Sequence, residues 1–156
     1  MKDNQQDNAG VIAPPPLIYA GGLTLGLLLS RALPLTVLPR TARRILGGLL
    51  AGSGVFLATV GFRTMRGAGT PVDPRETVTA LVVQGPFRYT RNPLYLSMTM
   101  LSTGIAFLAN ATAALLLLPG VLFIMQRGVI EREERYLERR FGASYTDYKT
   151  RVRRWL

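Results

Sequence analysis

The longest stretch without a charged side chain runs from residue 92 to residue 126. As one straight helix it would be about 50 Å long, well beyond the roughly 30 Å hydrocarbon core of a bilayer. We therefore expect the stretch to fold back on itself. The polar Asn110 is the predicted turn, between spans near 94–110 and 111–127.

Two further apolar stretches of roughly spanning length come earlier, at residues 16–35 and 45–62. Together with the later pair they predict four spans. Arg31 and Pro34 interrupt the end of the first stretch, so an interfacial or re-entrant helix stays open as the alternative there.

The second of these stretches contains several glycines. Gly48 and Gly52 lie four residues apart, a spacing of small residues that lets membrane helices approach closely. The run Gly52-Ser53-Gly54 could also be read as a nucleotide-binding loop, but no strand precedes it. Helix packing is the favoured interpretation.

These patterns predict an all-α integral membrane protein with about four transmembrane helices. Three segments follow: a polar tail at 1–13, a helical hairpin at 14–76 and a core at 77–156. The opening residues "MKDNQQDNAG" are polar and mixed in charge, so we expect no cleaved signal peptide.

The distribution of charged residues predicts how the helices are oriented across the membrane. The chain is 48% hydrophobic and has a net charge of +10, which on charge alone suggests nucleic acid. Most of the Lys and Arg fall in residues 63–91 and from 127 onward, on one side of a four-span arrangement. The positive-inside rule makes that side cytosolic, and no nucleic acid partner is expected. The connector at 31–44 lies on the other side and departs from the rule with four arginines.

The amino-acid composition limits the catalytic and metal-binding chemistry that the chain can perform. The chain contains no cysteine and no histidine. Disulfides, a thiol nucleophile, the usual zinc clusters and an imidazole base are therefore excluded, and no metal site is expected. Carboxylates, guanidinium groups, amides and tyrosines remain.

The chain changes character after residue 127, where charged residues become frequent. One stripe recurs at intervals of three and four residues: Ile130, Glu134, Leu137 and Phe141. The fourth span is therefore predicted to continue as an amphipathic helix that stops at Gly142. Glu133 lies beside Glu134, and a carboxylate facing a crevice at the membrane edge needs a partner or a ligand.

Two motifs at the cytosolic side resemble a known family. They are "GPFRYTRNPLY" at 85–95 and "EERYLERRFGASYTDY" at 133–148. Their combination is similar to the isoprenylcysteine carboxyl methyltransferase and phospholipid methyltransferase group of integral membrane enzymes. That group's pattern runs Gly-Pro-Tyr-x-x-x-Arg-His-Pro-x-Tyr and then Glu-Glu-x-x-Leu-x-x-x-Phe-Gly-x-x-Tyr-x-x-Tyr, and the similarity covers residues 77–152.

The resemblance implies a cofactor, S-adenosylmethionine, held where the connector and the C-terminal helix form a pocket. The positions matching the family's cofactor contacts are Thr79, Ala80, Leu81, Val82, Phe87, Asn92, Pro93, Leu94, Tyr95 and Glu133. Arg88 and Glu134 complete the expected cofactor-binding set, and Asn92, Arg91 and Glu133 are the expected catalytic residues. Aromatic and apolar groups suit the adenine and sulfonium, and charged groups suit the amino acid part.

Two positions depart from the family pattern. Asn92 stands where the family has histidine, so it can form hydrogen bonds but cannot transfer a proton at neutral pH. Val129 stands where isoprenylcysteine enzymes have an arginine implicated in handling the substrate carboxylate.

The predicted function is methylation, on the cytosolic face, of a lipophilic small molecule, lipid or prenylated acceptor that enters from the bilayer. Two alternatives stay open: a membrane reductase that uses NADPH, and a non-catalytic membrane interaction module. The sequence does not identify the acceptor or the oligomeric state.

Overall fold

The computed structural model describes residues 8–32 and 34–156, and this part of the chain is helical, without a strand. The long helices are α1 (Pro15–Ala32), α2 (Arg40–Gly67), α3 (Pro93–Leu108) and α4 (Thr112–Met125). A π-helical turn, η2 (Gln126–Ile130), joins α4 to α5 (Glu131–Phe141). A short 3-10 helix, η1 (Gly85–Arg88), precedes α3, and α6 (Ala143–Arg151) follows α5. The all-helical prediction is confirmed.

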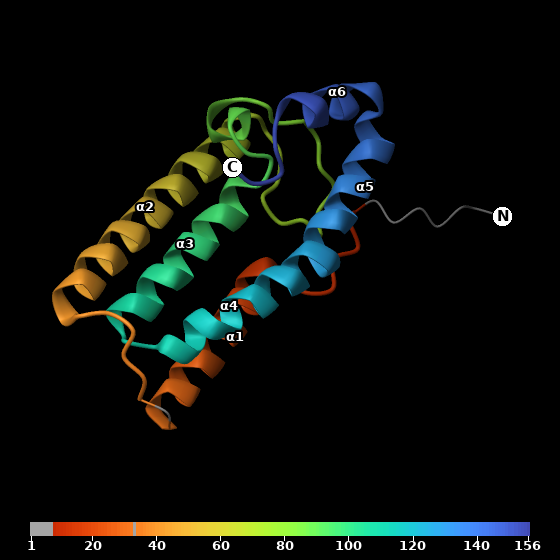
Figure 1. Ribbon diagram of the computed structural model, residues 1–156. Helices are drawn as coiled ribbons and strands as arrows, with labels where there is room; N and C mark the ends of the chain where they lie inside the picture. The colour runs from red at the N-terminus through yellow and green to blue at the C-terminus, as the bar shows by residue number, and fades with distance from the viewer. Residues whose placement is uncertain (1–7, 33) are drawn as a thin grey trace.

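The long helices pack as two antiparallel pairs, α1 with α4 and α2 with α3 (Figure 1). The connector between α2 and α3 lies at the same end of the bundle as α5 and α6. We call this the pocket end. The opposite end carries residues 34–39 and the turn at 109–111, and we call it the far end.

Two of the four expected spans have the length and apolarity needed to cross a membrane. They are α2 and the apolar part of the continuous helix Thr112–Phe141. α3 is apolar but has 16 residues, a rise of about 24 Å, which is less than the hydrocarbon core. α1 has 18 residues and includes Arg31 in its last turn. The prediction of four spans is therefore supported for two helices.

The predicted turn and helix stop are both present. Asn110 has φ of 55° and links α3 to α4, a left-handed conformation that asparagine adopts more readily than most residues. α5 ends at Phe141 and Gly142 follows with φ of 52°. The sequence did not predict that a further helix, α6, begins at once. The three-segment division of the chain stays a prediction.

Glycines bring α2 and α3 together, but not the pair that the sequence suggested. Gly48 and Gly52 have open space where a Cβ would stand, so their predicted role in packing within this chain is wrong. Gly47, Gly54 and Gly61 instead face α3, seven residues apart. A Cβ on Gly54 would lie 2.9 Å from the Ser97 carbonyl oxygen. Residues seven apart, about two helical turns, lie on the same side of a helix, so these glycines leave one side of α2 without side chains where α3 packs.

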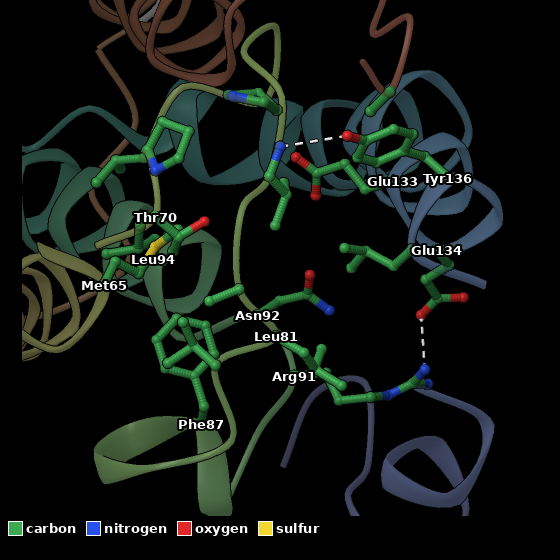
Figure 2. Close-up of a pocket in the computed structure, with 18 of the residues that line it drawn as sticks. Met65, Thr70, Leu81, Phe87, Arg91, Asn92, Leu94, Glu133, Glu134 and Tyr136 are labelled. Atoms are coloured by element: carbon green, nitrogen blue, oxygen red, sulfur yellow. Dashed lines mark hydrogen bonds and ion pairs between the residues drawn. The ribbon is translucent and has the colours of Figure 1, made fainter. Parts of the chain in front are cut away.

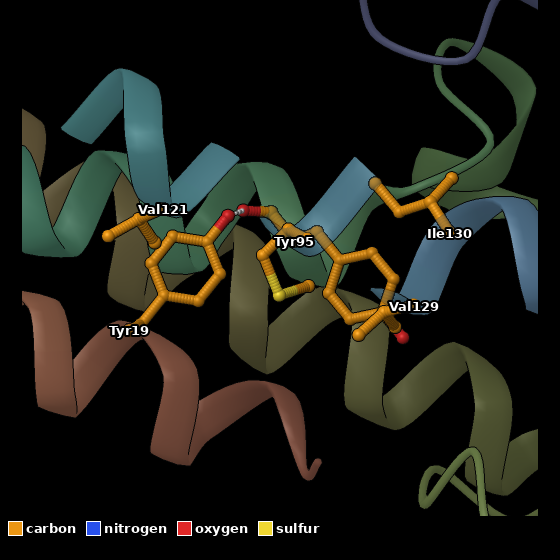
Figure 3. Close-up of a cluster of buried hydrophobic side chains, with 6 residues drawn as sticks. Tyr19, Tyr95, Val121, Val129 and Ile130 are labelled. Atoms are coloured by element: carbon orange, nitrogen blue, oxygen red, sulfur yellow. Dashed lines mark hydrogen bonds between the residues drawn. The ribbon is translucent and has the colours of Figure 1, made fainter. Parts of the chain in front are cut away.

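A buried cluster lies between the helix pairs, beneath the pocket end (Figure 3). Its members are Tyr19, Tyr95, Val121, Met125, Val129 and Ile130. The Tyr19 hydroxyl donates to the Tyr95 carbonyl oxygen at 3.2 Å and is 2.8 Å from the Thr99 hydroxyl. This ties α1 to α3 and satisfies a phenol that would otherwise be buried without a partner.

The contact between α2 and α3 should be sensitive to one methyl group. A Cβ on Gly104 would lie 2.5 Å from the Ala51 backbone nitrogen and 2.7 Å from the Gly47 carbonyl oxygen, so Gly104→Ala must separate the helices. We expect a loss of about 1–3 kcal/mol in the free energy of unfolding, the usual range for overpacking. Gly52→Ala, in the same kind of helix interior, should be neutral or stabilising. Denaturant unfolding in detergent measures both, and equal losses would contradict this helix interface.

Candidate functional site

A pocket with a cavity volume of about 120 Å³ opens at the pocket end, between the 68–92 connector and α5 (Figure 2). Apolar and aromatic side chains form most of its wall. The charged groups of the wall are three carboxylates and one arginine: Asp73, Glu133, Glu134 and Arg91.

The pocket brings together eleven of the thirteen residues expected from the sequence. They are Ala80, Leu81, Val82, Phe87, Arg91, Asn92, Pro93, Leu94, Tyr95, Glu133 and Glu134. The other two lie outside its wall. Thr79 is exposed, and its hydroxyl donates to the Gly69 carbonyl oxygen at 2.8 Å. Arg88 is exposed as well.

Glu133 faces the pocket and is held by Tyr95, whose hydroxyl donates to Glu133 Oε1 at 2.5 Å. Eight of the eleven residues of α5 are charged, so Glu133 lies past the apolar part of its long helix. Burial within the pocket wall raises the pKa of Glu133 from its usual 4.5 to about 7. The Tyr95 hydrogen bond lowers the pKa and the neighbouring Glu134 charge raises it, both by less. Glu133 therefore changes charge near neutral pH.

Glu134 is buried, and two arginines satisfy it. Arg154 donates from Nε and Nη2 to the two carboxylate oxygens, at 2.9 and 2.6 Å. Arg91 Nη1 lies 3.1 Å from Oε1, and the side chains of this second pair are each 9% exposed. Figure 2 shows the contact between Glu134 and Arg91 as a dashed line. The two adjacent glutamates thus differ: Glu134 is neutralised, whereas Glu133 has a hydroxyl partner.

The segment 152–155 binds the loop that leads into α3. The Thr90 hydroxyl and the Asn92 amide both donate to the Arg154 carbonyl oxygen, at 3.0 and 2.9 Å. The Arg91 N–H donates to the Arg153 carbonyl oxygen at 2.9 Å. Asn92 precedes Pro93 at the start of α3, and its side chain makes no capping hydrogen bond but binds this segment instead.

The comparisons with known proteins agree with this geometry. The family model described as phospholipid methyltransferase matches residues 42–144, about two thirds of the chain. The chain belongs to the phospholipid methyltransferase family. A relative from Haemophilus influenzae, described as an uncharacterized protein, is 44% identical over 64 residues, which are 40% of this chain and all of the relative. No solved structure matches the chain.

Membership in the phospholipid methyltransferase family implies methyltransferase activity and, together with the apolar helices, association with the lipid bilayer. The matched region begins near the start of α2 and ends at Ser144. It therefore contains both motifs apart from the last residues of the second, and it contains Glu133, Glu134 and the Arg-Asn-Pro sequence before α3.

Tyrosines outside the predicted set support the pocket wall in this family member. The Tyr148 hydroxyl donates to the Phe87 carbonyl oxygen at 2.7 Å and so fixes η1 against α6. The Val78 N–H donates to the Tyr136 hydroxyl at 3.2 Å. Tyr145 is buried, and its hydroxyl accepts from Arg91 Nη1 at 3.4 Å. The second motif, with its spaced tyrosines, was the signal that could have identified them.

The residues just before α1 also reach the pocket, which no sequence motif indicated. Ala9 lines the wall. The Ile12 N–H donates to the Gly128 carbonyl oxygen at 3.2 Å, within the π-helical turn η2. A Cβ on Gly128 would lie 2.3 Å from Ile12 Cδ1, so the Ile12 side chain packs directly against this glycine. Turns of this kind recur at functional sites, and this one directly precedes the helix that carries Glu133.

Loss of the Arg154 side chain should destabilise the fold. Arg154→Gln removes both hydrogen bonds to Glu134 and leaves a buried carboxylate with Arg91 alone. We expect a loss of about 1–3 kcal/mol in the free energy of unfolding. The matched control is Arg153→Gln, which removes the same charge from an exposed side chain. Unfolding in detergent, followed by circular dichroism, compares them, and an equal effect would mean that the contact with Glu134 adds no stability.

Proposed function

We propose that the chain is an S-adenosylmethionine-dependent methyltransferase that acts on a lipophilic acceptor at the cytosolic face of a membrane. The observation that carries this is the state of Glu133. Of the three pocket carboxylates, Asp73 pairs with Arg75 and Glu134 with Arg91 and Arg154. Glu133 has no cationic partner in the described part of the chain. It is therefore the carboxylate available to a bound molecule.

The pocket residues suit the parts of S-adenosylmethionine. Leu81, Val82 and Phe87 offer an apolar surface for adenine. The Glu133 carboxylate suits the ribose hydroxyls or the ammonium. The aromatic face of Tyr95 suits a sulfonium.

The site positions the cofactor and the acceptor and excludes water from them. When bound, the cofactor supplies a methyl group already activated by the sulfonium, and no covalent enzyme intermediate is needed. The apolar wall excludes water, and the contacts of Asn92 and Arg91 with the 152–155 segment fix the loop beside the cofactor. Asn92 positions and does not titrate. Glu133, with a pKa of about 7, can accept a proton from an acceptor that must lose one.

The acceptor is lipophilic and reaches the site from the bilayer. Met65, Pro93 and Leu94 form the wall where α2 ends and α3 begins, at the edge of the apolar helices. Val129 is fully buried in the apolar cluster, in the position where the resemblance places an arginine for a substrate carboxylate. A lipid or small hydrophobic molecule is therefore favoured over an isoprenylcysteine carboxylate.

The NADPH alternative is disfavoured by charge. A dinucleotide phosphate presents several anionic groups, and sites for them are built from arginines and free backbone N–H groups. The described wall has one arginine, and Glu134 already engages it.

Calorimetry of the detergent-purified protein tests the function. S-adenosylhomocysteine should bind and NADPH should not, and the reverse result would overturn the proposal. Glu133→Gln should lower the binding affinity for S-adenosylhomocysteine by roughly 10- to 100-fold, or about 1.5–3 kcal/mol, because a charge-assisted hydrogen bond is lost. Glu138→Gln is the control, since that carboxylate pairs with Lys149 at the surface. Equal small effects would mean that Glu133 does not contact the cofactor.

The affinity should also depend on pH. Burial raises the pKa of Glu133, so the cofactor-free site is protonated below about pH 7 and ionised above it. Binding should weaken as pH falls below 7, by up to about tenfold per unit, and Glu133→Gln should lose this dependence. The same shift makes the cofactor-free fold less stable as pH rises from about 4.5 to 7, because the folded state keeps a proton that the unfolded chain releases.

The proposed topology is multi-pass, with the pocket end cytosolic. The basis is the excess of Lys and Arg there and the return of the chain to that end after α2 and after α4. Single cysteines at Ala68 and Ser144, both exposed, should be labelled from the same side by an impermeant thiol reagent. A cysteine at Thr41, exposed at the far end, should be labelled from the other side. Opposite sidedness of Ala68 and Ser144 would refute this arrangement.

A further inference from the structure

The far end of the bundle carries an uncompensated positive charge. It consists of Arg31, Arg40, Arg43 and Arg44, which we call the far-end arginine surface. No acidic residue occurs from residue 8 through residue 72. None of the four side chains has a hydrogen bond or ion pair within the described part of the chain. Three are exposed, and Arg43 is half-buried.

The arginines at the pocket end are in a different situation. Arg75, Arg91, Arg127, Arg151 and Arg154 all pair with carboxylates. All acidic residues of the described chain lie at that end, in residues 73–76 and 131–147. The pocket end keeps an excess of positive charge, but five of its arginines have carboxylate partners, whereas the far end has no carboxylate in the described part of the chain.

Local structure adds to the charge at the far end. Three of the four arginines lie in the first turns of α2, where the helix dipole is itself positive. No side chain caps this helix start. Arg43 Nε is buried without a hydrogen-bond partner among the described residues. Four like charges in this setting repel one another unless an anion from outside the chain lies among them.

The surroundings indicate where that anion comes from. Exposed apolar side chains border the arginines on α1, on the following connector and on α2, and several are more than half exposed: Leu28, Leu35, Val37, Ile45 and Leu49. Arginines at the ends of apolar helices favour the headgroup level of a bilayer. Guanidinium groups bind phosphate oxygens through two parallel hydrogen bonds.

We propose that the far-end arginine surface binds anionic phospholipid headgroups in the leaflet opposite the pocket. An anionic headgroup presents its phosphate without the choline ammonium that would repel the arginines. This inference rests on the membrane placement proposed above but not on the cofactor. It also gives a physical role to the four arginines that depart from the positive-inside rule.

Spin-labelled lipids test the proposal with the full chain in phosphatidylcholine membranes. The motionally restricted fraction of labelled phosphatidylglycerol, relative to labelled phosphatidylcholine, measures the preference of the protein for the anionic headgroup. The parent should prefer phosphatidylglycerol severalfold, and added salt should reduce the preference. Each basic residue at the membrane surface contributes at most roughly a fivefold preference for an anionic lipid. The variant Arg40→Gln, Arg43→Gln and Arg44→Gln should therefore lose most of the preference for phosphatidylglycerol, and Arg31 and the pocket end account for what remains.

The matched control is the triple variant Arg135→Gln, Arg139→Gln and Arg140→Gln. It removes the same charge from three exposed arginines on α5, which lie among four glutamates. This variant should keep most of the preference. Equal loss in both triple variants, or no preference in the parent, would overturn the proposal.

Two further measurements test whether the variant is folded and whether the bound anion is a lipid headgroup. Circular dichroism checks that the far-end triple variant keeps its helix content, and the single variants Arg40→Gln and Arg44→Gln replace it if it does not. Each single variant should then lower the ratio on its own. Inorganic phosphate, added at an ionic strength matched with sodium chloride, should compete no better than chloride. Selective competition by phosphate would identify a site for the free anion and would overturn the assignment to lipid.

Discussion

Glu134 binds two arginines from distant parts of the chain, and the pocket depends on this contact. Arg91 comes from the loop before α3, Arg154 from the segment after α6, and Glu134 itself from α5. Ion pairs at the surface add little stability, but a buried carboxylate held by two guanidinium groups is costly to break. The segments that carry the two arginines are also joined by hydrogen bonds to the Arg153 and Arg154 carbonyl oxygens, so the contact fixes three parts of the pocket wall together.

This arrangement separates the roles of two neighbouring residues. Successive positions on a helix point about 100° apart, so Glu133 faces the pocket while Glu134 faces the arginines. The arginines neutralise Glu134 without reaching Glu133, whose burial then raises its pKa to about 7. One pair of adjacent carboxylates thereby supplies a structural contact and a group able to change charge.

The sequence predicted those features that depend on local pattern. The apolar periodicity and the turn chemistry of Asn110 and Gly142 are local, and the structure confirms the helices and both breaks. The two motifs selected most of the pocket wall. The sequence did not predict contacts that depend on how distant segments meet: the role of Arg154, the approach of Ile12 to Gly128, and the side of α2 that faces α3. A choice between Gly47 and Gly48 changes the facing side by about 100°, and composition does not decide it.

The position of Arg154 along the chain has a consequence for biosynthesis. Arg91 and Arg154 are 63 residues apart, and α3, α4, α5 and α6 all lie between them. A ribosome that has placed the first three helices in the bilayer has therefore not yet released Arg154, the second arginine that binds Glu134. Until Arg154 emerges, Glu134 lacks one of its two partners and the loop before α3 is not anchored. We infer that the pocket takes its final form after membrane insertion. Nascent chains stalled before residue 154 should be inserted in the membrane but lack the completed pocket.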